Sequence, residues 1–189
     1  DDASVTMTAC HIGANDEGGI KVFANANCSL SMIDCSIVGN RNSSGGAGGI
    51  TLEDGTLIME GCELSANWTE GPPYARGSAL NVVNGGSATL DRCTIAGNEG
   101  SDTAFWIGYT LSATITNSIV THNEATGIFK ELGSLNVRHS DFFHNAFVDV
   151  WYGPAGFGQL VDTNANGDSC DVYGNIFFDP LYVDQPGGD

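Results

Sequence analysis

Two acidic residues occupy equivalent outward positions in successive copies of a repeated motif, so they are the first candidates for chemistry. These are Glu60 and Asp91, with Arg92 beside them and Arg138 two copies further on. Two carboxylates about 5 Å apart would suit retaining glycoside hydrolysis, where one is a nucleophile and the other an acid. The chain has six Lys and Arg residues against 23 Asp and Glu, so basic partners are scarce. We therefore favour solvated surface charge.

The segment between residues 162 and 168 matches the first half of a calcium-binding loop. Oxygen ligands recur at alternating positions, and Gly167 stands at the expected sharp turn. The candidate ligands are Asp162, Asn164, Asn166 and Asp168. The position of the bidentate acid falls on Tyr173, so an ordinary turn rich in Asn and Asp is the alternative. Calcium is the one cofactor that the sequence predicts.

Two histidines, His122 and His144, directly precede the last Asn of successive motif copies, and His139 is nearby in sequence. If the two side chains stack at one corner, they could hold a transition metal. No carboxylate or cysteine is fixed at the same position of the motif. We therefore favour a hydrogen-bonded surface pair.

The net charge of −17 limits the possible partners. A surface this acidic repels nucleic acid and anionic membranes and attracts cations. The chain has no apolar run long enough for a membrane span, so we expect no membrane insertion. Three Asn-x-Ser/Thr sequons make glycosylation a further hypothesis. Their acceptor residues are Asn27, Asn42 and Asn67.

One motif occurs seven times and determines the expected fold: two apolar residues separated by a gap, then Cys or Ser, another apolar residue, and Asn. The final residues are Asn15, Asn40, Asn67, Asn98, Asn123, Asn145 and Asn175. The small residues five positions earlier are Cys10, Cys35, Cys62, Cys93, Ser118, Ser140 and Cys170. Their variable spacing suits solenoid coils that differ in loop length.

Each copy predicts at least two strands. Apolar residues ten and eight positions before the Asn, such as Leu30 and Met32, alternate with polar ones and indicate a strand with one buried face. A second short apolar strand follows each Asn. Stacked Asn side chains could hydrogen-bond to one another, and Asn tolerates a left-handed turn. The four ladder cysteines point the same way, so we favour buried free thiols over disulfides.

Segments such as Cys35 to Asn40 and Cys93 to Asn98 resemble right-handed parallel β-helix proteins of the pectin-lyase-like group. The closing stretch from Gly174 to Asp184 is similar to the tail of large secreted and surface β-helix proteins of bacteria and archaea. The resemblance implies an all-β, right-handed parallel β-helix of about seven coils and an extracellular or cell-surface location. We expect one domain over residues 1–189, less regular from about 153 to 189.

This scaffold carries enzymes, adhesins and inert spacers alike, so the fold alone does not give the activity. The catalytic signatures of the polygalacturonases are absent from the sequence, and we lean towards a non-catalytic protein. The first hypothesis is an extracellular structural or adhesive module. Its expected partners are further copies of itself, stacked end to end as a filament, or neighbouring domains of a longer chain.

The alternative hypothesis is a domain that binds or cleaves polysaccharide, because exposed aromatic rings can stack on sugars. The candidate stacking residues are Trp68, Tyr74, Trp106 and Trp151.

Overall fold

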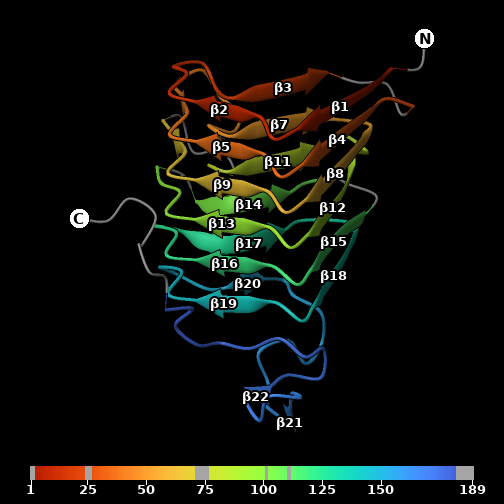
Figure 1. Ribbon diagram of the computed structural model, residues 1–189, viewed down its shortest axis with the longest axis vertical. Coiled ribbons are helices and arrows are strands. Elements are labelled where there is room, and N and C mark those ends of the chain that lie inside the picture. Colours follow the sequence, from red (N-terminus) through yellow and green to blue (C-terminus); the bar gives the residue numbers. More distant parts are fainter. Residues whose placement is uncertain (1–2, 24–26, 71–76, 101, 110–111, 182–189) are drawn as a thin grey trace.

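The computed structural model describes residues 3–23, 27–70, 77–100, 102–109 and 112–181. Three parallel sheets of six strands each wrap around one core, and successive coils stack along the long axis of the molecule (Figure 1). Among the described residues, no helix is long and apolar enough to cross a membrane. The predicted all-β, parallel solenoid is confirmed.

Each coil contributes one strand to each sheet. The first sheet contains β1 (Ser4–Thr8), β4 (Ser29–Ile33), β8 (Thr56–Glu60), β12 (Ser87–Asp91), β15 (Ser112–Thr116) and β18 (Ser134–Arg138). The second contains β2 (His11–Gly13), β5 (Ser36–Val38), β9 (Glu63–Ser65), β13 (Thr94–Ala96), β16 (Ile119–Thr121) and β19 (Asp141–Phe143). The third contains β3 (Ile20–Phe23), β7 (Ile50–Glu53), β11 (Leu80–Val83), β14 (Thr103–Ile107), β17 (Thr126–Lys130) and β20 (Val150–Trp151).

Two smaller pairings complete the strands. On one side, β6 (Arg41–Asn42) pairs in parallel with β10 (Trp68–Thr69). Beyond the last coil, β21 (Asp162–Thr163) and β22 (Ser169–Cys170) form an antiparallel pair.

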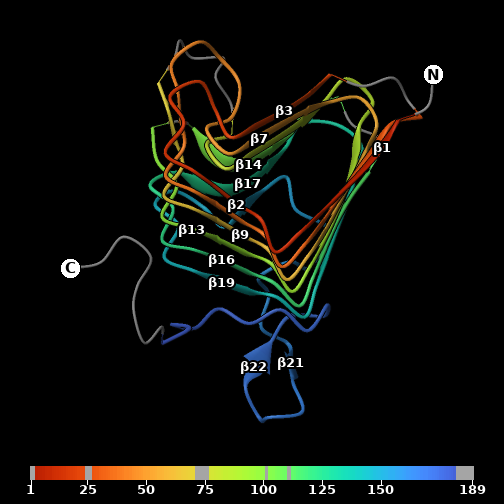
Figure 2. The same cartoon turned by 45° about the horizontal axis from the view of Figure 1, so that its top comes forward.

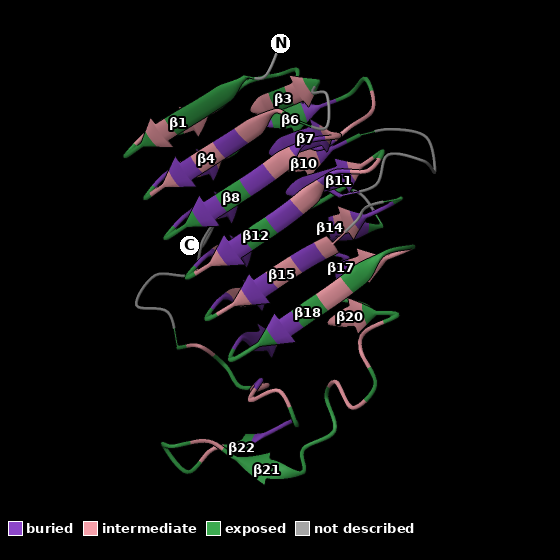
Figure 3. Cartoon of the chain, turned by 90° about the vertical axis from the view of Figure 1, so that its right-hand side faces the viewer, coloured by how far each residue is buried: buried purple, intermediate pink, exposed green. Residues whose placement is uncertain are grey.

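The core is built by alternation along the first sheet. Leu30 and Met32 are buried, and they align with Leu57 and Met59 in the next coil. The residues between them face outward, which gives the banded pattern of β4, β8 and β12 in Figure 3. Because parallel strands place equal positions side by side, one alternating pattern repeated in every coil makes a continuous apolar column.

Two sharp bends bound the second sheet and give each coil its angular outline (Figure 2). Backbone φ is positive at the residue before each Cys or Ser and again at the residue before each ladder Asn, for example Asp34 (51°) and Ala66 (50°). The left-handed residue is thus the neighbour of the ladder Asn and not the Asn itself. That part of the predicted reason for the ladder is wrong.

The Asn side chains do form the predicted ladder, running through Asn15, Asn40, Asn67, Asn98, Asn123 and Asn145. Each Nδ2 donates to the Oδ1 of the next Asn, over 2.7 to 3.1 Å. In the first four steps the backbone N–H donates to the same oxygen, as Asn67 does to Asn98 at 3.0 Å. At the end of the ladder, Asn145 donates instead to the Asp149 carboxylate at 2.8 Å.

A second column of small side chains runs along the other bend, through Cys10, Cys35, Cys62, Cys93, Ser118 and Ser140. The sulfur or hydroxyl oxygen accepts the backbone N–H of the preceding coil, as between Cys35 N and Cys62 Sγ at 3.4 Å. All six cysteines of the chain are unpaired. Burial raises the pKa of the Cys35 thiol, so it is a packing group with little thiolate at neutral pH.

The seventh motif copy does not continue either column in the predicted register. Asn175 Oδ1 accepts the backbone N–H of Ser140 at 3.1 Å, so Asn175 occupies the next position of the Cys and Ser column. Ile176 then forms an isolated bridge with Asp141. The irregular segment after β20 shifts the register, so Cys170 lies outside the column. Each sheet has six strands, so the solenoid makes five turns from its first rung to its last. The sequence predicted about seven coils.

The two ends of the solenoid differ in how far their apolar side chains are covered. At the last rung, the Phe142 ring packs against Phe157 and Phe177, with centroids 5.1 and 6.2 Å apart. At the first rung, the inward-facing Val5 is 53% exposed, whereas its neighbour Leu30 is 4% exposed. Of the described strands, β1, β2 and β3 each pair on one side, with β4, β5 and β7.

Candidate functional site

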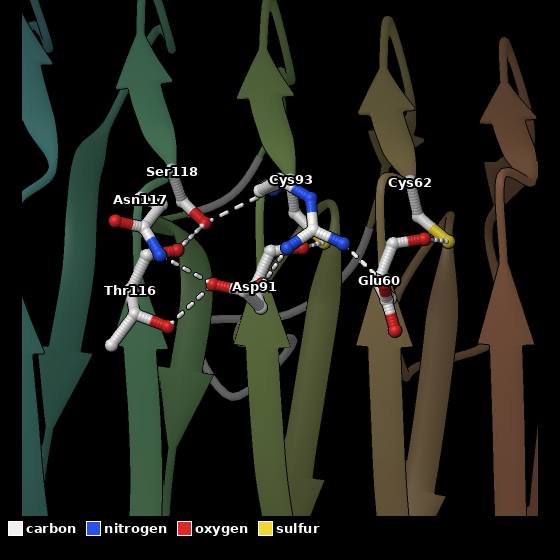
Figure 4. A network of polar contacts seen from close by, with 8 residues as sticks. Glu60, Cys62, Asp91, Cys93, Thr116, Asn117 and Ser118 are labelled. Carbon is white, nitrogen blue, oxygen red and sulfur yellow. Dashed lines mark hydrogen bonds and ion pairs between the residues drawn. The ribbon is translucent and has the colours of Figure 1, made fainter.

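The acid pair lies in register on the first sheet, where Asp91 aligns with Glu60. Arg92 stands at the following bend, with φ of 53°, and its guanidinium bridges both carboxylates. Figure 4 shows Asp91 between Glu60 on one side and Thr116 and Asn117 on the other. The second Asp91 oxygen accepts from Asn117 Nδ2 at 2.7 Å and from the Thr116 hydroxyl at 2.8 Å. These hydrogen bonds, that from Asn117 foremost, hold the pKa of Asp91 below its usual value.

Within this network Asp91 is held in its ionised form and is not poised to donate a proton. A retaining glycosidase needs one protonated carboxyl, and Asp91 is stabilised in its ionised form. Arg138 makes its own contacts: its Nε donates to Asn136 at 3.0 Å, and its guanidinium lies 5.7 Å from the Tyr173 ring centre. The geometry favours the interpretation as a surface ion-pair network. Such partly exposed pairs contribute little to stability, because solvent screens the attraction between the charges.

His122 and His144 do meet at one corner, with ring centres 5.2 Å apart in an edge-to-face arrangement. His122 Nδ1 also shares a hydrogen bond with the Thr121 hydroxyl at 2.7 Å. His139 stands at the other bend, before Ser140. Within the described part of the chain, no three His, Cys, Asp or Glu side chains gather as a metal site would require. The contacts are those of an edge-to-face ring pair in which His122 also shares a hydrogen bond with Thr121.

The candidate calcium ligands lie on the β21–β22 hairpin, beyond the last coil. Asn164 Oδ1 accepts the backbone N–H groups of Asn166 and Asp168, both at 2.9 Å. Asn164 Nδ2 donates to the Asp168 carboxylate at 3.0 Å, and the Asp162 carboxylate accepts the N–H of Thr163. These bonds close a tight turn and engage one side-chain oxygen each of Asp162, Asn164 and Asp168.

Calcium binding at this hairpin stays a prediction, and isothermal titration calorimetry tests it. A bound cation would have to replace the Asn164–Asp168 hydrogen bond, so we expect measurable heat of binding and protection of the hairpin from proteolysis. A titration without heat would rule calcium out. Asp168→Asn is the matched variant, because it removes one charge and keeps an oxygen acceptor in the turn.

Two of the three sequons have a structural role that conflicts with glycosylation. Asn42 is 1% exposed and donates its side-chain amide to the Ala47 carbonyl at 3.1 Å. Asn67 is fully buried in the ladder. A glycan on either amide nitrogen would remove these bonds and could not fit, so both are corrected to structural positions. Asn27 is exposed, and its glycosylation stays a prediction.

The aromatic candidates have different surroundings. Trp68 is half-buried, with the Arg41 guanidinium 4.0 Å from its ring centre. Tyr74 lies outside the described residues. Trp106 is half-buried in β14, where it aligns with Phe129 of β17. Phe129 aligns in turn with Trp151 of β20, which is 45% exposed.

The third sheet therefore carries an aromatic column of Trp106, Phe129 and Trp151, and a groove opens beside its last members. The groove measures about 310 Å³ and is lined by Asp102, Thr126, Phe129, Phe147 and Trp151. The sequence identified Trp151 but not Phe129 or Phe147. The alignment of second strands could have indicated Phe129, whereas Phe147 lies in a turn of no regular pattern.

Comparison with known proteins gives the family and little more. No curated protein matches this chain. Two solved structures of trypsin-treated QnrB1 variants, described as a plasmid-mediated fluoroquinolone resistance protein, align with it. The first is 14% identical with a TM-score of 0.21, and covers 94% of this chain and 92% of that one. The second is 13% identical with a TM-score of 0.21, and covers 95% and 92%.

A TM-score of 0.21 is too low to support any statement about function. The model of the right-handed β-helix region, by contrast, matches residues 1–177, which contain all six rungs. Together with the three parallel sheets and the two side-chain columns, this match shows that the chain belongs to the right-handed β-helix family.

Proposed function

We propose that this protein is a non-catalytic structural or adhesive β-helix module that works outside the cell or on its surface. The observation that carries the proposal is the contrast between the side-chain columns that link the coils and the acid pair on the surface. Continuous Asn and Cys/Ser columns link the coils by hydrogen bonds, whereas the guanidinium of Arg92 bridges the two carboxylates of the register-matched acid pair. The location rests on the resemblance of its repeats and closing stretch to secreted and surface proteins.

The first rung supplies the attachment face. Strands β1, β2 and β3 present an edge whose inward residue Val5 is 53% exposed, and solenoids normally protect such an edge. A second copy, or a neighbouring domain of a longer chain, would cover it. At the other end, Phe157 and Phe177 lie over Phe142. Filament growth would need this cover to move, so we expect isolated chains to associate through their first rungs.

Light scattering after size-exclusion chromatography tests this association. We expect the isolated chain to form concentration-dependent pairs, and Val5→Lys to remain a monomer because it places a charge on the inward face of the edge. Thr6→Lys is the matched control, since Thr6 is the neighbouring outward position on β1 and should leave pairing unchanged. A wild-type chain that stays monomeric at high concentration contradicts the association.

Catalysis is tested separately. We expect no new reducing ends and no unsaturated products from neutral or acidic polysaccharides incubated with the protein. Cleavage of any of these polymers, abolished by Glu60→Gln or Asp91→Asn, would refute the non-catalytic proposal.

The second candidate function is polysaccharide binding, and the aromatic column on the third sheet specifically favours it. The ring centres of Trp151 and its neighbour Phe129 lie 6.2 Å apart, beside a groove of ligand size. An adhesive module and a polysaccharide-binding module are compatible if this groove is the adhesive site.

A further inference from the structure

The groove on the third sheet is built by the register of the coils. Phe129 and Trp151 are paired in adjacent strands β17 and β20, and Tyr152 packs edge-on against Phe129 at 6.0 Å. Gly127 permits this approach, because a Cβ there would lie 2.6 Å from the Asp149 carbonyl oxygen. The turn between the last ladder Asn and β20 then brings Phe147, 70% exposed, to the other wall.

The groove combines aromatic faces with a few polar groups. Trp151 and Phe147 are exposed although they are large and apolar, so their rings are available for stacking. Thr126 is buried, and its backbone N–H donates to the Asp102 carbonyl at 3.3 Å, which fixes the two polar residues relative to each other. The exposed Asp102 carboxylate can accept hydrogen bonds from hydroxyl groups.

Charge decides which ligand class fits. Among the described residues that line the groove, Asp102 is the charged one, and it is negative. The whole chain carries −17. Anionic sugars would meet a repulsive field with no lining cation to offset it. A volume of about 310 Å³ lies at the lower end of ligand sites, which are roughly 300–1,000 Å³, and suits one or two rings.

We propose that the groove of Phe129, Phe147 and Trp151 binds an uncharged sugar unit of a polysaccharide, with its ring stacked on the aromatic faces and its hydroxyls donating to Asp102. This inference rests on the adhesive part of the proposed function. It assigns the adhesive contact to the side of the rod near its last rung, away from the first-rung edge that we expect to pair.

Calorimetric titration with neutral hexasaccharides of glucose, mannose and xylose tests the site, with hexagalacturonate as the charged comparison. We expect saturable binding of at least one neutral oligomer and weaker or absent binding of hexagalacturonate. Trp151→Ala should weaken binding by roughly tenfold or more, as loss of a central aromatic contact does. Phe147→Ala, at a more exposed position, should also weaken it and keeps the test valid if Trp151→Ala unfolds.

Trp68→Ala is the matched control, because Trp68 lies on β10 with its ring already covered by Arg41. It should leave the affinity unchanged. The proposal is overturned if no neutral oligomer binds at millimolar concentration, if neither groove variant alters the affinity, or if hexagalacturonate binds equally well. Self-association that depends on Trp151 would also overturn the proposal, because a second copy of the chain would then occupy the groove. The Val5→Lys and cleavage experiments are unaffected by these outcomes, so failure of the groove and failure of the module are distinguishable.

Discussion

Replacing Asn67 with Leu is expected to lower the free energy of unfolding by about 3–5 kcal/mol, because it interrupts the ladder at a fully buried rung. Asn67 Nδ2 donates to Ile37 O at 2.8 Å and to Asn98 Oδ1 at 3.1 Å. Its own Oδ1 accepts the backbone N–H and the Nδ2 of Asn40, both at 3.1 Å. Leu has a similar size but satisfies none of these groups, and each one left buried and unpaired costs about 1–3 kcal/mol.

Urea unfolding of two further variants separates the ladder from a general effect of the substitution. Asn136→Leu makes the same change at an exposed outward position of β18, and we expect a loss below about 0.5 kcal/mol. Asn15→Leu removes the exposed first rung, which donates but is not enclosed, so its loss should be intermediate. If Asn67→Leu and Asn136→Leu lose similar stability, the ladder is not a major source of stability.

Much of this architecture could be predicted because a parallel solenoid repeats each environment once per coil. Leu30, Leu57 and Ala88 occupy one column, and the sequence aligns them without knowledge of the structure. The same logic aligned the Asn ladder. Columns in which one residue type recurs are readable, since a side chain's neighbours are the equivalent side chains of the adjacent coils.

The bends could not be predicted from the sequence, because no single residue type occupies their positions. Their left-handed positions hold Ala14, Asp34, Gly61, Arg92 and His122, which share no chemistry that a pattern could reveal. The second sheet between the bends has strands of three residues, too short for a periodicity.

The seventh copy shows how the motif can mislead. Its letters match those of the other copies, but Gly174 takes the left-handed position before Asn175 that His139 takes before Ser140. Asn175 is therefore structurally equivalent to Ser140 of the preceding coil and not to a ladder asparagine. The hydrogen bond from Ser140 N to Asn175 and the bridge between Asp141 and Ile176 reveal this register.

Candidate sites were harder to predict than the columns, because they depend on what covers each position. Nothing in the sequence distinguishes Trp68 from Trp151 as a stacking residue. In the structure, the Arg41 guanidinium covers the ring of Trp68, whereas Trp151 is 45% exposed. Glu60 and Asp91 were correctly placed side by side, but the guanidinium of Arg92 between them changes their chemistry. The spacing of the repeats predicts that the two carboxylates lie close together, but it does not predict that a guanidinium lies between them.

Asp141→Asn is expected to raise the free energy of unfolding at neutral pH by about 3 kcal/mol. Asp141 is 9% exposed at the start of β19, and burial raises its pKa to about 6. The nearby carboxylates Asp149 and Asp179 contribute to this rise, whereas the N–H groups of Phe178 and Phe142 oppose it. Asn keeps an oxygen that accepts the Phe178 N–H, bonded at 3.2 Å, and removes the buried charge.

The pH dependence distinguishes this mechanism from better packing. Because the folded pKa exceeds the unfolded value near 3.9, the folded state binds the proton more tightly. Wild-type stability should therefore fall as pH rises from about 4 to about 6 and stay low above that range. The gain from Asp141→Asn should be near zero at about pH 4 and complete at about pH 7.

Urea unfolding across this range measures the gain, and Asp91→Asn is a control of opposite sign. The pKa of Asp91 is lowered, so its charge stabilises the fold above the unfolded pKa, and that contribution is lost as pH falls. Because Asp91 is at the surface, its variant should lose a small amount of stability at neutral pH. A pH-independent gain from Asp141→Asn would contradict a buried charge. A gain in Asp141→Asn together with a loss in Asp91→Asn would mean that the buried carboxylate of Asp141, which accepts the Phe178 N–H, opposes the folding of the last coil at neutral pH.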